Sequence, residues 1–554
     1  MIRDEVVALV EQALAAAQAA GALPEFAAPA VTAEHPARPE NGDFSSNVAL
    51  RIQGMARMKA IEVAEALRQH VPAHPAIEKV TVAPPGFVNF YLAPAWAAAQ
   101  ADAIASAGQA YPALDLGGGR TAQIEYVSAN PTGPIHVGNG RGAAIGSTLA
   151  NVMTAAGYRV QQEYYINDAG TQVGIFGRTL YARYEQLHGR EASVPENGYP
   201  GQYMVDVAQT IKDRFGDQYL RPPGEDAGPE IGRLGIDIMI EGIRADLALM
   251  GAEYDQWYSE RSLMAHGGPY DMVMAILKNQ GQVVERDGAT WFTSSDLGES
   301  KDNVLIRSDG APTYYATDIA YHYDKFITRK FDRVVDIWGA DHQGHVSRVK
   351  AGVQATGADP EALDVLLYQL VTLRRGDLVV PLSKRAGEIV TLRDVIEEVG
   401  RDATRFFFLI TGANQTMDFD LDLAKKQSDE NPVYYVQYAH ARIASVIAKA
   451  AVEGHTSAGA DTALLTHEAE QTLLRKLLLL PEVLEKAVLE LAPHHLTHYA
   501  QELAGAFHSF YTQCRVIQAD QPALTKSRLR LLEATQAVLA RTLGLMGITA
   551  PEQM

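Results

Sequence analysis

The chain has 554 residues, of which 47% are hydrophobic and 21% charged; this length exceeds a single core, and roughly three or four domains are expected. The formal net charge of −19 argues, taken alone, against a nucleic-acid binder, although an acidic chain can carry a local basic surface. The single cysteine excludes a disulfide framework and a multi-cysteine zinc site, and no uncharged apolar run approaches the length of a membrane span. We therefore expect a cytoplasmic protein with no membrane association.

The first region, residues 1–112, has the pattern of an α+β domain. Its predicted elements are helices over 1–20, 55–70 and 94–107 and strands over 79–83 and 86–92. The glycine-rich segment 114–120 then reads as a flexible joint.

The second region, residues 113–428, alternates predicted strands and helices. A strand over 121–130, a helix over 143–157 and a strand over 159–168 form a βαβ unit, which predicts a parallel sheet. The stretch 190–230 is rich in glycine, proline and charge, and we interpret it as part of an insertion near 190–260. The remaining predicted elements are helices near 169–188, 342–356 and 391–411 and strands over 288–295, 303–318, 333–340 and 364–373.

The third region, residues 429–554, is predicted to be all helical. Pro481 is expected to break or kink its longest helix, and Gly547 is placed to end the last one. The apolar face of that last helix is predicted to consist of Leu531, Leu532, Thr535, Val538, Leu539 and Leu543.

The segment NPTGPIHVGNGRG, residues 130–142, lies between a predicted strand and a predicted helix. A helix N-terminus presents free N–H groups to an anion, and glycines let a phosphate approach the backbone. The segment matches neither the P-loop nor the dinucleotide-binding pattern. A strand–helix turn with a satisfied, buried His136 remains an equal alternative from these residues alone.

A second segment, RRGDLVVPLSKRAGEIVTL at 374–392, is predicted to be a hairpin followed by an exposed loop and a helix start. The loop carries Ser383, Lys384 and Arg385. Cations on a loop can close over a polyphosphate and stabilise its charge during transfer. A solvated surface loop is the alternative, but the two segments in this order across a parallel sheet are more specific than either alone.

These segments resemble the HIGH and KMSKS signatures of class I aminoacyl-tRNA synthetases, as HVGN (136–139) and PLSKR (381–385). The resemblance to arginyl-tRNA synthetases extends over essentially the whole chain. It is carried by SANPTGPIHVGNGRG, YYINDAGTQ, DGAPTYYATDIAYHYDKF, WGADHQGH, YVQYAHARI and LGLMGITAPEQM. The resemblance implies a Rossmann-like α/β catalytic core with a parallel sheet, an α+β N-terminal domain and an all-α C-terminal bundle that binds the anticodon. The chain departs from the signatures at Asn139, Pro381 and Leu382, so the catalytic lysine falls on Lys384.

The resemblance also implies a reaction. The carboxylate of L-arginine attacks the α-phosphate of ATP, and the adenylate then acylates the 3′ end of tRNA(Arg). The residues expected to act in catalysis are His136, Asn139, Ser383 and Lys384. The residues expected to bind ATP are Pro131, Gly133, His136, Gly138, Asn139, Gly140, Lys384 and Arg385. Mg²⁺ is expected from the phosphate chemistry, with ATP as its main ligand because the sequence shows no metal-ligand cluster.

The arginine pocket is expected at strand ends, because a guanidinium favours paired carboxylates. Candidates from strand ends are Glu125, Ser128, Asn130, Asp341 and His342, and the resemblance adds Tyr314 and Asp318. Two alternatives stay open. Asp318 would instead cap a helix N-terminus, or Glu125 would pair internally with an arginine such as Arg141.

The resemblance further assigns tRNA contacts. Phe87 is expected to stack on a base at the tRNA corner and Asn89 to hydrogen-bond to one, although alternating residues of this kind are also typical of one face of a β-sheet. Tyr435, Tyr438 and Arg442 are expected to meet the anticodon, together with Tyr434 and His440, although a tyrosine-rich helix is more often core. The local positive surface is expected to include Arg405, Lys425, Lys426 and Arg442.

Two rival functions remain. The chain could activate another amino acid such as cysteine, against which the single cysteine and the lack of a zinc ligand set argue. It could also be a catalytically silent, tRNA-binding paralogue, which Asn139 and Pro381 keep open while His136, Lys384 and Asp318 oppose it. We expect a monomer.

Overall fold

A five-stranded parallel sheet forms the centre of the computed structural model, which describes residues 1–222, 225–381 and 389–554. The strand order is β11-β10-β4-β5-β6, and every neighbouring pair is parallel. The strands are β4 (Thr121–Tyr126), β5 (Arg159–Ile166), β6 (Gln256–Ser259), β10 (Arg333–Gly339) and β11 (Leu363–Tyr368). Strand β4 has β5, the next strand in the chain, on one side and β10, a much later strand, on the other. The direction in which strands are added to the sheet therefore reverses at β4, and ligands bind at such a reversal in folds of this kind.

Helix α5 (Val137–Ala155) connects β4 to β5 and starts earlier than the predicted helix at 143. The His136 side chain caps it by accepting a hydrogen bond from the backbone N–H of Gly138. Glycine is unfavourable in a helix, but close packing requires it here, because a Cβ at Gly146 would lie 2.2 Å from the ring of Tyr126. Tertiary contacts thus make a glycine-rich segment helical.

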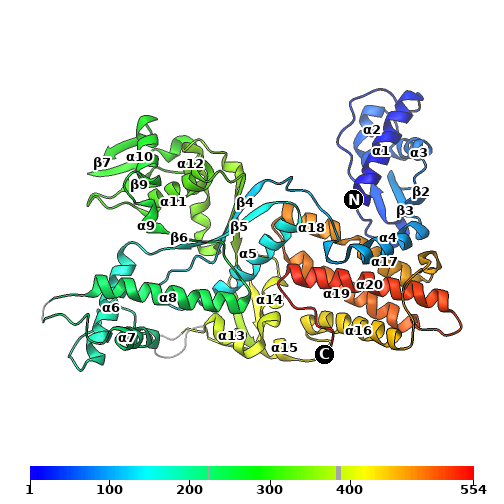
Figure 1. Cartoon of the computed structure of the whole chain (residues 1–554). Helices are drawn as coiled ribbons and strands as arrows, with labels where there is room; N and C mark the ends of the chain where they lie inside the picture. Colours follow the sequence, from blue (N-terminus) through cyan, green and yellow to red (C-terminus); the bar gives the residue numbers. More distant parts are fainter. Residues whose placement is uncertain (223–224, 382–388) are drawn as a thin grey trace.

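The N-terminal region consists of helices around an antiparallel sheet of order β1-β3-β2. Its elements are α1 (Ile2–Ala19), β1 (Phe44–Ser46), α2 (Val48–Ala56), α3 (Ala60–His70), β2 (Ile77–Ala83), β3 (Phe87–Leu92) and α4 (Pro94–Ala107). The single helix predicted over 55–70 is wrong in part, because Arg57 adopts a left-handed backbone and separates two helices. Figure 1 shows this region above the C-terminal helices, with α4 between them.

Two units extend from the parallel sheet. The first unit comprises α6 (Thr171–Leu187), α7 (Gln202–Phe215) and α8 (Gly228–Met250), which pack together at one side of the molecule (Figure 1). The second comprises α9 (Glu260–Leu263), α10 (Pro269–Asn279), an antiparallel β7-β8-β9 sheet (Val283–Arg286, Ala289–Phe292, Asn303–Ile306), α11 (Tyr314–Tyr323) and α12 (Val346–Ala355). The strand predicted over 303–318 is wrong beyond Ile306, because Thr313 caps a helix that begins at Tyr314.

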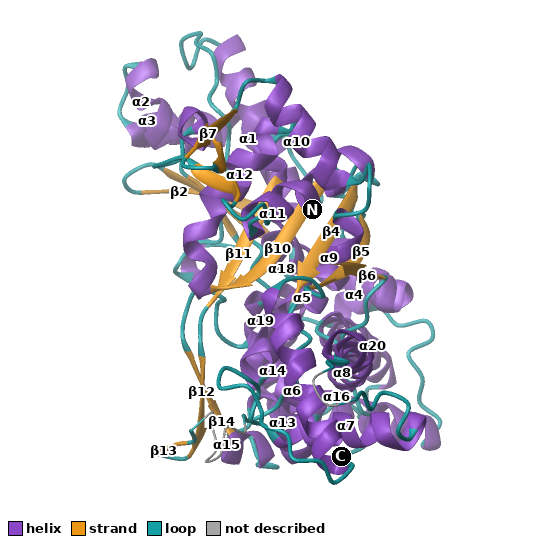
Figure 2. Ribbon diagram, turned by 90° about the vertical axis from the view of Figure 1, so that its left-hand side faces the viewer, coloured by secondary structure: helices purple, strands orange, loops and turns teal. Residues whose placement is uncertain are grey.

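A small second sheet leads from the parallel sheet to the C-terminal helices. It has the order β13-β12-β14 and lies apart from the central strands (Figure 2). The elements are β12 (Val371–Arg375), β13 (Leu378–Val379), α13 (Leu392–Val399), α14 (Arg401–Leu409), β14 (Met417–Asp420) and α15 (Leu421–Lys425). The helix predicted over 391–411 divides at Gly400, whose φ of 86° an α-helix does not admit.

The C-terminal region is helical as predicted. Its helices are α16 (Pro432–Val452), α17 (Glu468–Leu478), α18 (Leu480–Leu489), α19 (His494–Gln513) and α20 (Pro522–Leu545). Pro481 lies in the first turn of α18, so the predicted break is confirmed, and all six residues of the predicted apolar face of α20 are buried. The three-part fold class is therefore confirmed, whereas the domain limits at 112 and 428 stay predictions. Among the described residues, none of the helices has the length and apolar character needed to span a membrane.

Candidate active site

A cleft of about 710 Å³ opens at the carboxyl ends of the central strands. Its lining includes all seven residues predicted for the arginine pocket, and Asn139 from the first turn of α5. Those seven are Glu125, Ser128, Asn130, Tyr314, Asp318, Asp341 and His342. The cleft therefore joins the predicted amino-acid pocket to the N-terminus of α5.

The turn after β4 shapes the floor of this cleft. Val127 and Ser128 have φ values of 69° and 40°, a conformation that costs energy in residues with a side chain. The Ser128 hydroxyl donates to Glu125 Oε1 at 2.9 Å and accepts from the backbone N–H of Tyr165 at 3.1 Å. Ser128 thus fixes the direction of the Glu125 carboxylate rather than pointing freely at a ligand.

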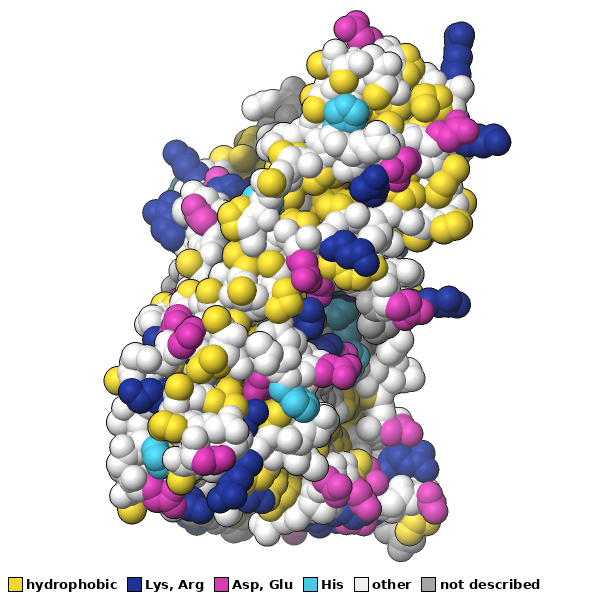
Figure 3. Space-filling view, turned by 90° about the vertical axis from the view of Figure 1, so that its right-hand side faces the viewer, with side chains coloured by type: hydrophobic (Ala, Val, Ile, Leu, Met, Phe, Trp, Pro, Cys, Tyr) yellow, Lys and Arg dark blue, Asp and Glu magenta, His cyan; other side chains and the backbone are white. Residues whose placement is uncertain are grey.

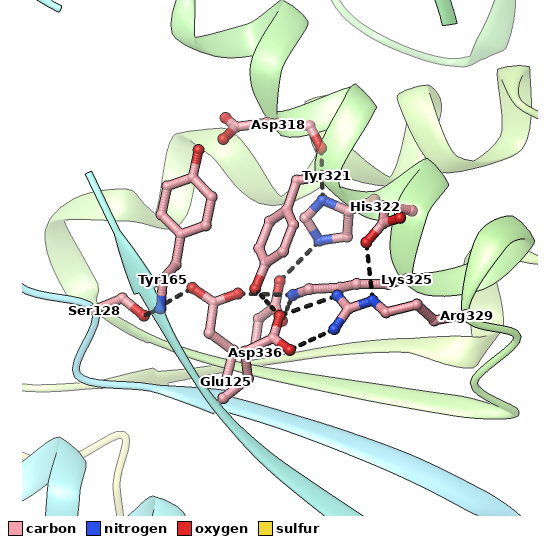
Figure 4. Close-up of polar contacts among 11 residues, drawn as sticks. Glu125, Ser128, Tyr165, Asp318, Tyr321, His322, Lys325, Arg329 and Asp336 are labelled. Atoms are coloured by element: carbon pink, nitrogen blue, oxygen red, sulfur yellow. Dashed lines mark hydrogen bonds and ion pairs between the residues drawn. The ribbon is translucent and has the colours of Figure 1, made fainter. Parts of the chain in front are cut away.

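Glu125 belongs to a buried ion-pair network (Figure 4). Lys325 Nζ lies 2.7 Å from Glu125 Oε2 and 2.7 Å from Asp336 Oδ1, and the lysine side chain is 0% exposed. Burial raises the pKa of Glu125, whereas the pKa of Asp336 falls to about 2 because Lys325 and His322 outweigh its burial. The internal-pairing alternative for Glu125 is thus correct in kind but wrong in partner, since Arg141 instead donates to four backbone carbonyls.

His322 connects this network to Asp318. Its Nδ1 lies 2.8 Å from the carbonyl oxygen of Asp318, and its Nε2 lies 2.8 Å from Asp336 Oδ2. His322 therefore links the backbone of α11 to the carboxylate of Asp336. Arg329 forms a parallel pair with Glu163, which also accepts from the Tyr321 hydroxyl.

Asp318 keeps its carboxylate without an ion pair in the described part of the chain. The side chain is half-buried in the middle of α11, so its alternative role as a helix N-cap is wrong and Thr313 takes that place. Burial raises its pKa to about 7, with further contributions from nearby Glu125 and Glu260. The ionised form of such a buried, unpaired carboxylate is strongly stabilised when a cation binds beside it.

A further carboxylate, Glu260 at the start of α9, was not found from the sequence. It is 5% exposed, burial raises its pKa, and its Oε2 has no hydrogen-bond partner among the residues described. No motif surrounds it, although a strand-end position could have indicated it. Glu260 is not among the lining residues of the cleft. The lining does include residues that were not predicted: Tyr165, Asn167, Gln172, Tyr321, His322, Asp336, Trp338, His345 and Tyr368.

The rim of the cleft is open to solvent. Tyr314 is 52% exposed, and Asp341 and His342 are exposed with their nearest side-chain atoms 3.6 Å apart. Asn130 is also exposed. These four side chains are exposed and therefore accessible to a ligand that enters the cleft.

His136 marks the nucleotide side of the cleft. Its Nδ1 accepts from Gly138 N–H at 3.0 Å, it is half-buried, and burial lowers its pKa. Gly138 is explained by this cap, because a Cβ there would approach Nδ1 to 3.1 Å. Gly140 has a packing role instead of facing a nucleotide, since its Cβ would lie 2.6 Å from Leu392. Pro131 is buried.

The segment that follows the second signature is hydrogen-bonded to the first. Val137 N–H donates to the Val390 carbonyl at 3.1 Å, and Leu392 N–H donates to the Ile135 carbonyl at 2.9 Å. Ser383, Lys384 and Arg385 lie outside the described residues. The described residues that follow, 390–392, pair with residues 135–137, and Thr391 bridges His136.

The predicted tRNA-contacting residues lie in two places. Phe87 and Asn89 line a separate cleft of about 430 Å³ in the N-terminal region, where Asn89 Oδ1 accepts from the Ser45 hydroxyl at 2.7 Å. On α16, the Arg442 guanidinium lies 5.2 Å from the Tyr438 ring and 5.4 Å from the Tyr511 ring of α19.

Neighbouring positions on α16 differ in access. Tyr434, Tyr435 and Tyr438 are partly exposed, whereas His440 is buried and its Nδ1 lies 2.8 Å from the carbonyl oxygen of Pro551. His440 therefore holds the C-terminal segment instead of being free to meet a base.

The expected positive surface is only partly present. Arg405 is 0% exposed, so its proposed surface role is wrong: its guanidinium binds the Met546 and Met250 carbonyls. Lys425 pairs with Glu398 and Lys426 with Glu430. Figure 3 shows basic and acidic side chains interspersed over the face that includes the N-terminal region.

The parallel sheet with its order reversal at β4, the capped α5 and the pairing of residues 390–392 with residues 135–137 fit the class I aminoacyl-tRNA synthetase fold. Comparison with known families agrees: residues 102–196 and 265–439 match the catalytic domain of class I (R) tRNA synthetases. Residues 4–92 match the arginyl tRNA synthetase N terminal domain, and residues 436–554 match the DALR anticodon binding domain.

Full-length relatives narrow the class. The arginine--tRNA ligase of Dehalococcoides mccartyi is 52% identical over 100% of this chain and 99% of its own, and that of Carboxydothermus hydrogenoformans is 46% identical over 94% of each. The chain therefore belongs to the arginyl-tRNA synthetase family. The Thermus thermophilus arginyl-tRNA synthetase structure, 22% identical, shares the fold with a TM-score of 0.77 over 100% of both chains.

Proposed function

We propose that this chain activates L-arginine with ATP to arginyl-adenylate and pyrophosphate, and transfers the arginyl group to the 3′ end of tRNA(Arg). The observation that carries the proposal is a carboxylate-rich cleft that opens beside the N-terminus of α5, against which residues 390–392 are hydrogen-bonded. That arrangement brings a cation-binding pocket and an anion-binding helix end to one place.

Asp318 is the proposed partner of the arginine guanidinium. Glu125 and Asp336 share the single charge of Lys325, so they are proposed to orient the pocket, with Glu125 a weaker partner of the substrate than Asp318. Glu260 is the proposed second carboxylate, and the exposed Tyr314 is placed to close over the planar group. Ser128 is proposed to act through the Glu125 carboxylate that it orients, and Asn130, Asp341 and His342 are proposed to contact the rest of the amino acid.

The first step is displacement at phosphorus, in which the protein positions groups and stabilises charge. His136 and Asn139 are proposed to donate to phosphate or ribose, with Gly133 and Gly138 leaving the backbone accessible, whereas Pro131 is buried and is not proposed to contact ATP directly. Lys384 is proposed to stabilise the departing pyrophosphate, assisted by Ser383 and Arg385. Among described residues no group of three or more His, Cys, Asp or Glu is arranged to hold a metal ion, so we assign no step to Mg²⁺, whose expected ligands are the phosphates of ATP.

The second step needs tRNA. We propose that Phe87 and Asn89 meet a base at the tRNA corner and that Tyr435, Tyr438 and Arg442 stack on the anticodon. The corresponding domains are 1–112, 113–428 with an insertion near 190–260, and 429–554. A cytoplasmic monomer stays a prediction, and light scattering of the purified chain tests the oligomeric part.

Arginine-dependent ATP–pyrophosphate exchange, measured with and without tRNA, tests the proposal. Exchange with arginine and arginylation of tRNA(Arg) are the expected results. Exchange driven by another amino acid would instead identify a synthetase of different specificity. No exchange with any amino acid, with tRNA present, would identify a silent tRNA-binding paralogue.

A further inference from the structure

The unit of helices α6, α7 and α8 meets the active site at two places: the Tyr203 hydroxyl of α7 bonds to the loop after β4, and Gln172 of α6, held by Tyr199 from the α6–α7 connection, lines the cleft. We infer that this unit is a brace for the active site: Tyr203 positions the nucleotide-facing loop, and Tyr199 positions Gln172 at the amino-acid side. The inference rests on the proposed function and assigns a role to the insertion. Residues 197–264, which include Tyr199 and Tyr203, lie between the two segments that match the catalytic domain family.

Tyr203 lies in the first turn of α7 and contacts the loop between β4 and α5. Its hydroxyl donates to the carbonyl oxygen of Thr132 at 2.9 Å. The same hydroxyl would lie 3.6 Å from a Cβ built at Gly133, so the ring lies close to this part of the loop. Thr132 is buried and precedes Gly133, which is proposed to face ATP. The hydrogen bond therefore restrains the backbone where a nucleotide would approach it.

Tyr199 contacts the other side of the cleft. Its hydroxyl donates to Oε1 of Gln172, a residue of the first turn of α6 that lines the cleft. Its ring meets Phe176 edge-on with centroids 5.9 Å apart, and its backbone N–H lies 3.4 Å from the Thr179 hydroxyl. With its amide oxygen held, Gln172 presents its two N–H donors in a fixed direction.

The brace does not depend on these hydroxyls for its own folding. Helices α6, α7 and α8 share a separate apolar cluster, which includes Phe176, Leu180, Met204 and Ile231. Tyr184 on α6 provides a matched control, because its hydroxyl also donates to a backbone carbonyl, that of Gly216 at 2.6 Å, but within the unit and away from the cleft.

The test uses three single-atom deletions in the full chain, Tyr203→Phe, Tyr199→Phe and Tyr184→Phe, in arginine-dependent pyrophosphate exchange. Losing one hydrogen bond that is needed for binding geometry should change KM by about threefold to tenfold. Tyr203→Phe should raise KM for ATP, Tyr199→Phe should raise KM for arginine, and Tyr184→Phe should change neither. Amide hydrogen exchange should speed up at residues 131–136 in Tyr203→Phe but not in Tyr184→Phe.

The outcomes separate the two proposals. No exchange by the unsubstituted chain, with tRNA present, would overturn the proposed function on which the brace rests. An active chain in which Tyr203→Phe and Tyr199→Phe keep both KM values would overturn the brace alone. The same holds if all three variants raise both KM values equally, since that result would reflect a general loss of structure.

Discussion

Two groups of buried or partly buried cations in this chain are compensated in opposite ways. Under the amino-acid cleft, the fully buried Lys325 and the partly exposed Arg329 lie against carboxylates of Glu125, Asp336 and Glu163. Arg141 joins α5 to carbonyls of residues 369 and 411–415, and Arg405 joins α14 to the carbonyls of Met250 and Met546; both side chains are 0% exposed. Within the described segments their partners are backbone carbonyls and hydroxyls, with no carboxylate among them.

The pKa values of these cations move in opposite directions. Carboxylates raise the pKa of Lys325 and Arg329 despite burial, whereas burial lowers the pKa of Arg141 and of Arg405 to about 10. Charge pairs under the cleft fix carboxylate directions beside a cationic substrate. Carbonyl-bound arginines join distant segments without placing further carboxylates in the interior. The comparison therefore separates residues that organise a substrate site from residues that organise a junction.

Removing the lysine under the cleft should have the largest effect on stability. Lys325→Met leaves Glu125 and Asp336 buried without their cation, and breaking a buried pair in this way costs about 3–5 kcal/mol. We expect the midpoint of urea unfolding to fall accordingly. The double variant Glu125→Gln/Lys325→Met should recover part of the loss, because one uncompensated charge is gone. A double variant less stable than the single one would contradict the ion-pair interpretation.

The free carboxylate of the cleft should dominate arginine activation. Asp318→Asn keeps the shape of the side chain but removes its charge, and losing one partner of a desolvated charge pair costs about 2–5 kcal/mol, or roughly 30-fold to 4000-fold in kcat/KM for arginine. KM for ATP should be unchanged in pyrophosphate exchange. Glu125→Gln is the matched control and should lose less, since Lys325 already neutralises Glu125. Equal losses in both variants would show that the two carboxylates act alike.

Removing an arginine at the junction should cost less than removing Lys325. Arg141→Met leaves the carbonyls of Gln369, Thr411, Gly412 and Gln415 without this donor but strands no charge, so we expect a destabilisation of about 2 kcal/mol. Arg141→Lys should restore part of it. Thermal unfolding of the three chains measures both effects. A loss as large as that of Lys325→Met would remove the distinction between the two groups.

The sequence predicted those features of the fold that depend on local periodicity. Alternating strands and helices indicated the parallel sheet, and strand-end polar residues indicated the cleft, whose lining includes every predicted arginine-pocket residue. The early start of α5 escaped prediction because glycine has a poor helix propensity, and only contacts such as Tyr126 against Gly146 select it.

The pairing of buried charges could not be predicted from local pattern. Glu125 and Lys325 are 200 positions apart, so nothing in either neighbourhood indicates the other. Arg405 likewise looked like a surface cation, because its burial depends on the Met546 and Met250 carbonyls that distant segments supply. The family resemblance predicted that Asp318 lies in the pocket. That Asp318 has no ion pair could not be predicted, because it depends on Lys325 pairing with Glu125 and Asp336 instead.

The smallest expected effect is a pH dependence that separates Asp318 from the paired carboxylates. Its pKa is raised to about 7 by burial and by the nearby Glu125, Glu260 and Asp336, against the opposing influence of His322. Below pH 7 the free enzyme holds Asp318 protonated, so KM for arginine should rise by up to about tenfold per pH unit as the pH falls. Asp318→Asn should abolish this dependence.

Stability without arginine should show the opposite trend. Because the folded pKa of Asp318 lies above the unfolded value near 3.9, the folded state holds the proton more tightly. The resulting stabilisation is complete below about pH 4 and is lost as the pH rises through 7. The unsubstituted chain should therefore lose stability relative to Asp318→Asn between pH 5 and 8, and saturating arginine should cancel that loss by pairing with the ionised carboxylate. Thermal melting of both chains at pH 5 and pH 8, with and without arginine, measures this. The account is refuted if the stability difference between the two chains is the same at both pH values and arginine does not change it.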